Sequence, residues 1–223
     1  MHLTAADHEK VSKAIAAAEA STDGEIVAVA APLSDPYHDV ALHWAIAVLI
    51  LVLAWAAWQP SSLTWWYDFL FGGWRPEPTL GELLTFLMVL AVLKFTAVLL
   101  ILKWMPLRLA LTPGATKHRR VRRRALTIFK TAAERRTVGR TGILIYLSTG
   151  ERRAEIVADS AITDVTTAET WGEAMATLLA DVHDGRPGDG ICAAIQQIGV
   201  VLAEHFPKSA GNPNEIPDKL IEL

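Results

Sequence analysis

The stretch "TGILIYLSTGERRAEIVADS", residues 141 to 160, carries the strongest fold signal in this chain of 223 residues. Two runs rich in apolar and β-branched residues, 142–148 and 154–159, stand on either side of the segment "TGER". This pattern is typical of two antiparallel strands joined by a tight turn. An isolated hairpin is not stable in water, so neighbouring segments must supply the rest of a core.

Helical segments lie on both sides of this hairpin. "RRRALTIFKTAAERRTVG", residues 122–139, predicts a helix with Ala125, Ile128, Phe129 and Ala132 facing inward. "TAETWGEAMATLLADVHDG", residues 167–185, predicts a second helix, and "DGICAAIQQIGVVLAEHF", residues 189–206, predicts a third that Pro207 ends. The predicted apolar side of the second helix consists of Trp171, Met175, Leu178, Leu179 and Val182.

The N-terminal segment predicts one more helix and one more strand. Residues 3–24 read as an amphipathic helix with Thr4 as the N-cap and Asp7 three residues later. "EIVAVAA", residues 25–31, has the length and composition of a strand. One helix and one strand cannot bury a core, so this strand is expected to pair with the strand at 142–148. The sequence thus predicts an α/β domain with a central sheet flanked by helices, built from two separated pieces.

Between the two pieces lie two long apolar runs, residues 40–58 and 83–102. The first contains no Asp, Glu, Lys or Arg, and as a helix it would measure about 28 Å, close to a hydrocarbon core of about 30 Å. Lys94 alone interrupts the second run, where it either snorkels towards the headgroups or makes a polar contact across the hairpin. The runs predict a two-helix transmembrane hairpin; the alternative is a buried hairpin in a soluble core. Tryptophans expected at the membrane interfaces are Trp58, Trp65, Trp66, Trp74 and Trp104.

The charge distribution predicts the orientation. The formal net charge is −3, yet eight Lys and Arg lie between Lys103 and Arg124, whereas the loop at 59–82 holds only Arg75. Positive residues next to a span stay in the cytoplasm, so both termini are expected inside and the loop outside, in the cytoplasmic (inner) membrane. Nucleic-acid binding is disfavoured because the flanking globular segments are acidic. The expected contacts with anionic headgroups are Arg119, Arg120, Arg122, Arg123 and Arg124.

Motifs for catalysis are absent from the sequence. It contains no glycine-rich phosphate loop, no Gly-x-Ser-x-Gly elbow and no His-Glu-x-x-His, and its one cysteine, Cys192, excludes an internal disulfide. The acidic loop "DGRPGDG", residues 184–190, reads either as a plain turn with Asp189 near a helix N-terminus or as part of a Ca²⁺ or Mg²⁺ site. Catalytic residues are therefore left unassigned. The candidate metal ligands are Asp23, Asp159, Asp164, Asp184 and Asp189.

The chain resembles the TPM domain, a family also labelled TPM phosphatase, in a bacterial membrane branch with a hairpin inserted inside the domain. The resemblance rests on a Thr-Gly-x-Leu-Ile strand, an arginine-bearing hairpin, an Ile-Val-x-Asp strand, a Trp-bearing helix and an Asp-Gly before the last helix. The matching residues are Thr141, Gly142, Arg152, Arg153, Ile156, Val157, Asp159, Trp171, Asp189 and Gly190. The resemblance implies a compact α/β fold, and acid phosphatase activity and calcium binding are associated with some members.

Two functions follow as expectations. The first is a membrane-anchored accessory or interaction protein that binds another membrane protein and is not an enzyme; the second is a weak metal-dependent acid phosphatase. The expected division is 1–39 and 125–207 for the two parts of the domain, 40–58 and 83–102 for the spans, 59–82 for the external loop, 103–124 for a basic juxtamembrane segment and 208–223 for a polar tail.

Overall fold

The chain divides into two units in a computed structural model that describes residues 3–72, 77–132, 140–210 and 215–223. Unit 1 consists of Met1–Pro36 and Gly114–Leu223, and unit 2 of Tyr37–Pro113. Unit 1 is therefore built from both ends of the chain, with unit 2 inserted between them.

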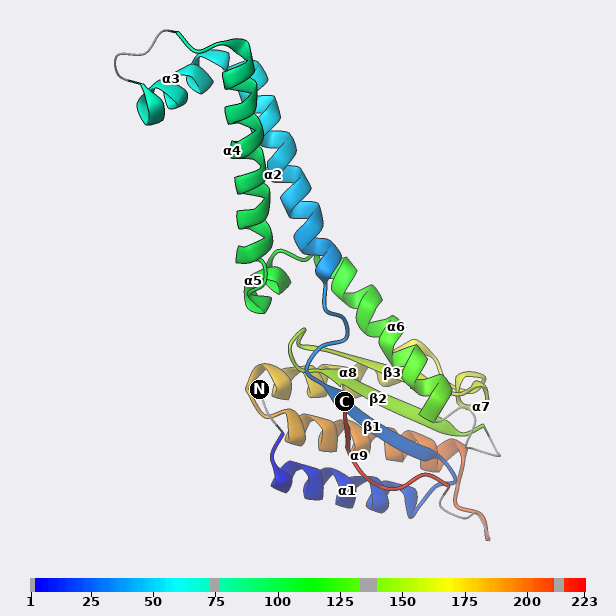
Figure 1. Cartoon of the computed structure of the whole chain (residues 1–223). Helices are drawn as coiled ribbons and strands as arrows, with labels where there is room; N and C mark the ends of the chain where they lie inside the picture. Colours follow the sequence, from blue (N-terminus) through cyan, green and yellow to red (C-terminus); the bar gives the residue numbers. More distant parts are fainter. Residues whose placement is uncertain (1–2, 73–76, 133–139, 211–214) are drawn as a thin grey trace. The chain divides into compact units, whose positions relative to one another are not determined.

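The described part of unit 1 contains a four-stranded sheet in the order β3-β2-β1-β4 (Figure 1). β1 (Glu25–Ala31) runs parallel to β2 (Gly142–Ser148), with Val27 opposite Leu144. This confirms the predicted pairing of the two separated pieces. β2 and β3 (Arg153–Ala158) form the predicted antiparallel hairpin.

Helices cover both faces of this sheet (Figure 1). On one face lie α1 (Ala5–Glu19), α8 (Gly172–His183) and α9 (Pro187–His205), whose apolar side chains pack with Ile143, Ile145 and Leu147 of β2. The predicted Thr4–Asp7 capping box begins α1. The other face is covered by α6 (Gly114–Ala132). The chain is thus a mixed α/β protein with a sheet between helical layers.

The position of α6 corrects the predicted division of the chain. The helix begins at Gly114, eight residues before the predicted start at residue 122, because Val121, Ala125 and Phe129 recur every four residues and are all buried. The basic run within 103–124 is therefore largely the exposed side of a helix packed on the sheet. Ile128 packs against the same cluster, and residues 133–139, where the helix was predicted to end, lie outside the described residues.

The C-terminal residues also differ from the predicted polar tail. β4 (Ile221–Glu222) pairs in parallel with β1, and Ile216 and Leu220 are buried. A two-residue strand in a polar, Pro-containing segment leaves no periodic signal, which explains why the sequence did not predict it. The tail thereby covers the β1 side of the sheet.

The described residues of unit 2 form two long apolar helices and two short ones. α2 (His38–Trp58) and α4 (Leu80–Ile101) pack along each other, and α3 (Pro60–Phe71) contacts both. α3 occupies much of the segment predicted as an external loop, and Pro60 in its first turn is a common helix start. α5 (Met105–Ala110) follows, and the buried Arg108 donates from Nε to the Leu102 carbonyl at 2.6 Å, beyond the last turn of α4.

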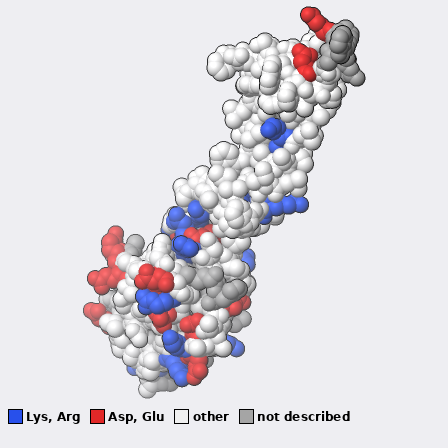
Figure 2. Space-filling model, turned by 90° about the vertical axis from the view of Figure 1, so that its left-hand side faces the viewer, with Lys and Arg blue, Asp and Glu red and all other residues white. Residues whose placement is uncertain are grey.

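The surface of unit 2 is apolar. The two long helices have mean hydropathies of 2.4 and 2.5, and buried residues make up only 22% and 6% of their most apolar windows. Leu51 on α2 is 65% exposed and Leu93 on α4 is 61% exposed, while Lys94 also lies exposed. Figure 2 shows that the face of this unit turned to the viewer carries few charges. Length and composition fit two membrane spans, and the weak burial differs from that of a soluble core helix.

Candidate functional site

Asp159 and Asp164 lie at the two ends of the short helix α7 (Ser160–Thr163). Asp159 is the N-cap and is buried; its Oδ1 accepts a hydrogen bond from the Ser160 backbone N–H at 2.7 Å. Its Oδ2 is buried without a partner among the described residues. Asp164 is the exposed C-cap. The first carboxylate thus has a local structural role as a cap.

Asp184 and Asp189 both lie near the positively charged side chain of Arg186. The guanidinium of Arg186 lies 2.5 Å from Asp181, 3.2 Å from Asp184 and 3.9 Å from Asp189. Lys10 of α1 adds a contact of 3.0 Å to Asp189. Because these carboxylates already contact cations of the chain, the arrangement favours the interpretation of 184–190 as a turn held by ion pairs.

Asp23 lies at the start of β1, where its Oδ1 accepts a hydrogen bond from the Ser209 backbone N–H at 3.0 Å. Across the described ranges, no three His, Cys, Asp or Glu side chains group in a way that could hold a metal ion. The five candidate aspartates are distributed over α7, the α8–α9 turn and the β1 start, and Asp184 and Asp189 share a neighbour, Arg186. A Ca²⁺ or Mg²⁺ site on them stays a prediction.

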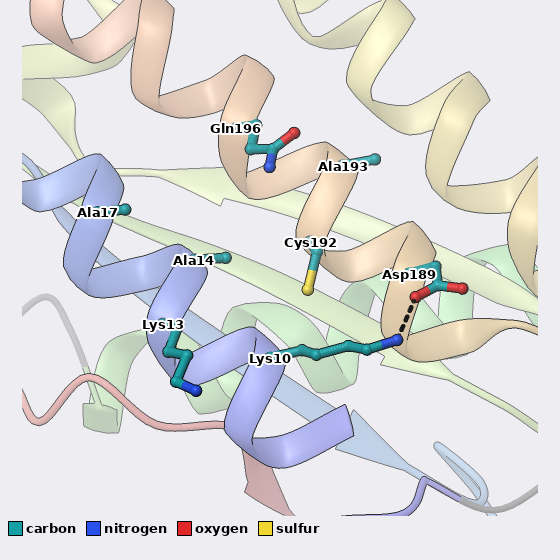
Figure 3. Close-up of a pocket in the computed structure, with 8 residues that line it drawn as sticks. All are labelled: Lys10, Lys13, Ala14, Ala17, Asp189, Cys192, Ala193 and Gln196. Atoms are coloured by element: carbon teal, nitrogen blue, oxygen red, sulfur yellow. Dashed lines mark hydrogen bonds and ion pairs between the residues drawn. The ribbon is translucent and has the colours of Figure 1, made fainter. Parts of the chain in front are cut away.

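A shallow groove of about 530 Å³ lies between α1 and α9 (Figure 3). The Lys10–Asp189 ion pair crosses one end, and small residues, Ala14, Ala17 and Ala193, form part of the lining. Cys192 is half-buried here, and burial raises the pKa of its thiol. A raised thiol pKa means a small thiolate fraction at neutral pH, so the cysteine fits a packing role better than a nucleophilic one.

A larger groove of about 740 Å³ runs along the outer edge of β3, and we call it the edge groove. Its floor is the β3 segment 155–158. One wall comes from α6. The other comes from α8, from the short 3₁₀ helix η1 (Ala168–Trp171) before it and from residues 163–167 at and after the end of α7. The wall residues are Arg122 and Leu126 on one side and Thr163, Thr166, Thr167, Trp171, Gly172, Met175, Ala176 and Leu179 on the other.

The edge groove changes the predicted role of α8. Of its predicted core residues, Leu178 and Val182 are fully buried, but Trp171, Met175 and Leu179 are only half-buried and line the groove. Sequence reasoning missed this because helical spacing does not distinguish a core position from a groove position. One signal in the sequence could have indicated the groove: the apolar face of α8 is wider than its contact with the core requires.

A polar network joins the ends of β1 and β2. The Glu151 carboxylate accepts hydrogen bonds from the Ser34 N–H at 3.0 Å, from the Ser34 hydroxyl at 2.8 Å and from the Ser148 hydroxyl. The Ser34 hydroxyl also lies 3.0 Å from the Tyr146 hydroxyl, whose pKa is raised by burial. Because Ser34 gives its proton to Glu151, Tyr146 is the donor in this pair. The network fixes the chain where it leaves β1.

Two buried glutamates lie at the opposite ends of these strands. The pKa of Glu19 is raised to about 8, chiefly by burial and also by the nearby Glu25 and Asp218, although a hydrogen bond from the Ile26 N–H at 2.7 Å acts to lower it. The Glu25 carboxylate accepts from the Glu215 and Ile216 N–H groups at 3.4 and 3.3 Å. Both carboxyls therefore connect α1 and β1 with the C-terminal residues.

The exposed side of α6 carries most of the predicted basic residues. Arg119, Arg122 and Arg123 are exposed, whereas Arg120 is largely covered and contacts Asp35 at 2.6 Å. Arg124 lies next to the Tyr146 hydroxyl. Arg120 thus differs from its neighbours in the run, because an internal ion pair already engages it.

The comparisons with known proteins bear on the fold alone. No protein-family model matches the chain, and no curated protein matches it. Among solved structures, it is similar to the NMR structure of BA42 protein from the psychrophilic bacterium Bizionia argentinensis sp. nov.. The TM-score is 0.57 with 16% sequence identity, and the match covers 100% of this chain and 97% of that chain. At this identity the likeness shows a shared α/β fold.

Proposed function

We propose that this chain is a membrane-anchored interaction protein, with a cytoplasmic α/β unit of the TPM type held at the inner membrane by an inserted helical hairpin. The observation that carries the proposal is the exposure of apolar side chains along α2 and α4. Leucines such as Leu51 and Leu93 would face water in a soluble protein, whereas lipid solvates them without cost.

The aromatic residues of α3 support the same proposal. Trp65 and Trp66 are exposed, Trp65 stacks on Phe69, and Tyr67 contacts Phe86 of α4. A short helix rich in Trp, Tyr and Phe is suited to the membrane interface, where rings with one polar group are favoured. Exposed Lys94 can snorkel from α4, and the basic side of α6 can meet anionic headgroups through Arg119 and Arg123.

We prefer binding to catalysis for the α/β unit. The acidic loop that would serve a metal-dependent phosphatase contains Arg186, which already contacts Asp181, Asp184 and Asp189. A calcium site needs several oxygen ligands that converge on the ion itself. The edge groove, in contrast, offers apolar side chains next to a strand edge that no second strand pairs with among the residues described, which suits a protein partner.

Cysteine labelling tests the orientation. In a Cys192→Ala background, we expect a maleimide that cannot cross the inner membrane to label Ser61→Cys in cells with an intact inner membrane, once the reagent can reach its outer side. Ser209→Cys should react only after the inner membrane is permeabilised, because the positive charges keep both termini inside. Both serines are exposed, so local burial does not bias the comparison. The reverse pattern would contradict the cytoplasmic assignment, and the Cys192→Ala chain alone is the unlabelled control.

A further inference from the structure

The two edges of the sheet in unit 1 differ. On one side the C-terminal strand β4 pairs with β1, so the chain covers that part of the sheet itself. On the other side β3 pairs with β2, and no second strand among the described residues pairs with β3. The outer backbone N–H and C=O groups of an edge strand form a template for a further strand.

The edge groove gives that template two walls. Side chains of β3 alternate between the two faces of the sheet: Glu155 and Val157 point to the α6 side, and Ile156 and Ala158 to the α8 side. A strand added next to β3 would alternate in the same way. Its side chains would therefore meet Leu126 and Arg122 on one wall and Trp171, Met175 and Leu179 on the other.

The walls also limit what can enter. Helices α6 and α8 line the groove from both faces of the sheet, so a strand that is already part of a helix-covered sheet would bring its own helices into collision with them. An isolated extended segment has no such flanks. A second copy of this chain pairing through its own β3 edge would bring its own α6 and α8 with it.

The exposed charge on the α6 side of the groove favours an acidic partner. Glu155, which also lines the groove, lies 3.2 Å from His118 and is attracted by Arg122, and its side chain is largely covered. Arg122 is exposed on the same wall, and α6 adds the exposed Arg119 and Arg123 outside the groove. The α6 side therefore carries more exposed positive than negative charge, while the opposite wall combines Trp171, Met175 and Leu179 with threonines.

We propose that the edge groove binds an extended, acidic segment of a partner protein as an additional strand on β3. Apolar side chains of that segment pack on Trp171, Met175 and Leu179, and an acidic side chain faces Arg122. This inference rests on the proposed function, since it names the kind of segment through which an interaction protein would recognise its partner. Main-chain hydrogen bonds to β3 provide affinity, and the two walls provide specificity.

A displayed library of randomised peptides tests the proposal with the full chain in detergent micelles. Peptides of about ten residues, at about 3.3 Å per residue, are long enough to span β3. We expect the selected peptides to have apolar residues at every second position, which would face Trp171, Met175 and Leu179. At a fixed position between them we expect an acidic residue that would face Arg122. Synthetic copies should slow hydrogen exchange across residues 153–158.

Matched variants locate the binding site. Ala176→Arg places a long side chain in the groove from an exposed position on α8 and should weaken the selected peptides by at least about tenfold. Ala180→Arg, exposed one turn further along α8 and outside the groove lining, should change affinity by less than about twofold. Arg122→Glu should switch the preference from an acidic to a lysine-bearing copy of the peptide, whereas Arg123→Glu should not.

The alternatives give distinct results. The proposal is wrong if no peptide is enriched, if the enriched peptides bind Ala176→Arg as well as the original chain, or if the groove is filled by a second copy. The last case would be seen as a dimer that Ala176→Arg dissociates. Each of these outcomes can occur while the chain remains in the membrane, so failure of the groove is distinguishable from failure of the anchor.

Discussion

Val27→Asp is expected to unfold unit 1, including the segment at 142–205 that lies more than one hundred residues away. Val27 is 2% exposed, pairs with Leu144 of β2 and packs against the α6 side chains. A carboxylate at this position would be buried without a partner, which costs several kcal/mol and is comparable with the whole stability of a domain. Hydrogen exchange of the β2 amides in the full chain measures the loss.

The control for this prediction is Val200→Asp on α9. Val200 is 71% exposed, so the same change in charge and volume should alter stability by less than about 0.5 kcal/mol. The split-domain account would fail if residues 114–223, expressed alone, protected the β2 amides as well as the full chain does. Such a result would mean that β1 is dispensable for the fold.

Glu19→Gln is expected to remove much of the pH dependence of unit 1 between about pH 5 and pH 8. The folded pKa of Glu19 is about 8 and its ordinary value is 4.5. A raised pKa in the folded state means that the protonated carboxyl stabilises the fold below the ordinary pKa, and this stability is lost as the pH rises through 8. The slope for one such group is up to about 1.4 kcal/mol per pH unit.

The comparison isolates Glu19 from its neighbours. The other charged groups of this region remain in the variant and contribute equally to both profiles. They are Glu25, whose pKa is also raised by burial, and Glu215, Asp218 and Lys208. Gln keeps an oxygen that can accept from the Ile26 N–H and cannot ionise. The variant should therefore gain stability over the original chain as the pH rises. The control is Glu9→Gln on the same helix: the Glu9 side chain is 69% exposed, so this change should leave the pH profile of stability nearly unchanged. If the profile of Glu19→Gln ran parallel to that of the original chain, the role of Glu19 burial would be refuted.

The pairing of β1 with β2 could be predicted from the sequence because its cause is local and general. The strand at 25–31 is apolar throughout, and the helix before it cannot cover it alone, so a partner had to come from beyond the apolar runs. The hairpin at 142–158 and the Thr4 cap were predictable from turn and capping chemistry. These features depend on residues close in sequence or on a single burial requirement.

The candidate site could not be predicted in the same way. The order of strands is not encoded in periodicity, so nothing in residues 153–158 indicates that β3 lies at an edge. Ser34 and Glu151 are 117 residues apart, and their contact depends on the completed sheet. Arg120 resembles Arg119 in sequence, and only the rotation of α6 turns it towards Asp35.

Extraction of membranes at alkaline pH tests the central claim most directly, namely that unit 2 anchors this chain in a lipid bilayer. Such treatment releases proteins held by charge at the membrane surface and leaves those held by apolar spans. The account predicts that the full chain stays in the membrane pellet, because the exposed leucines of α2 and α4 are solvated by lipid. Release of folded chain into the supernatant would contradict it.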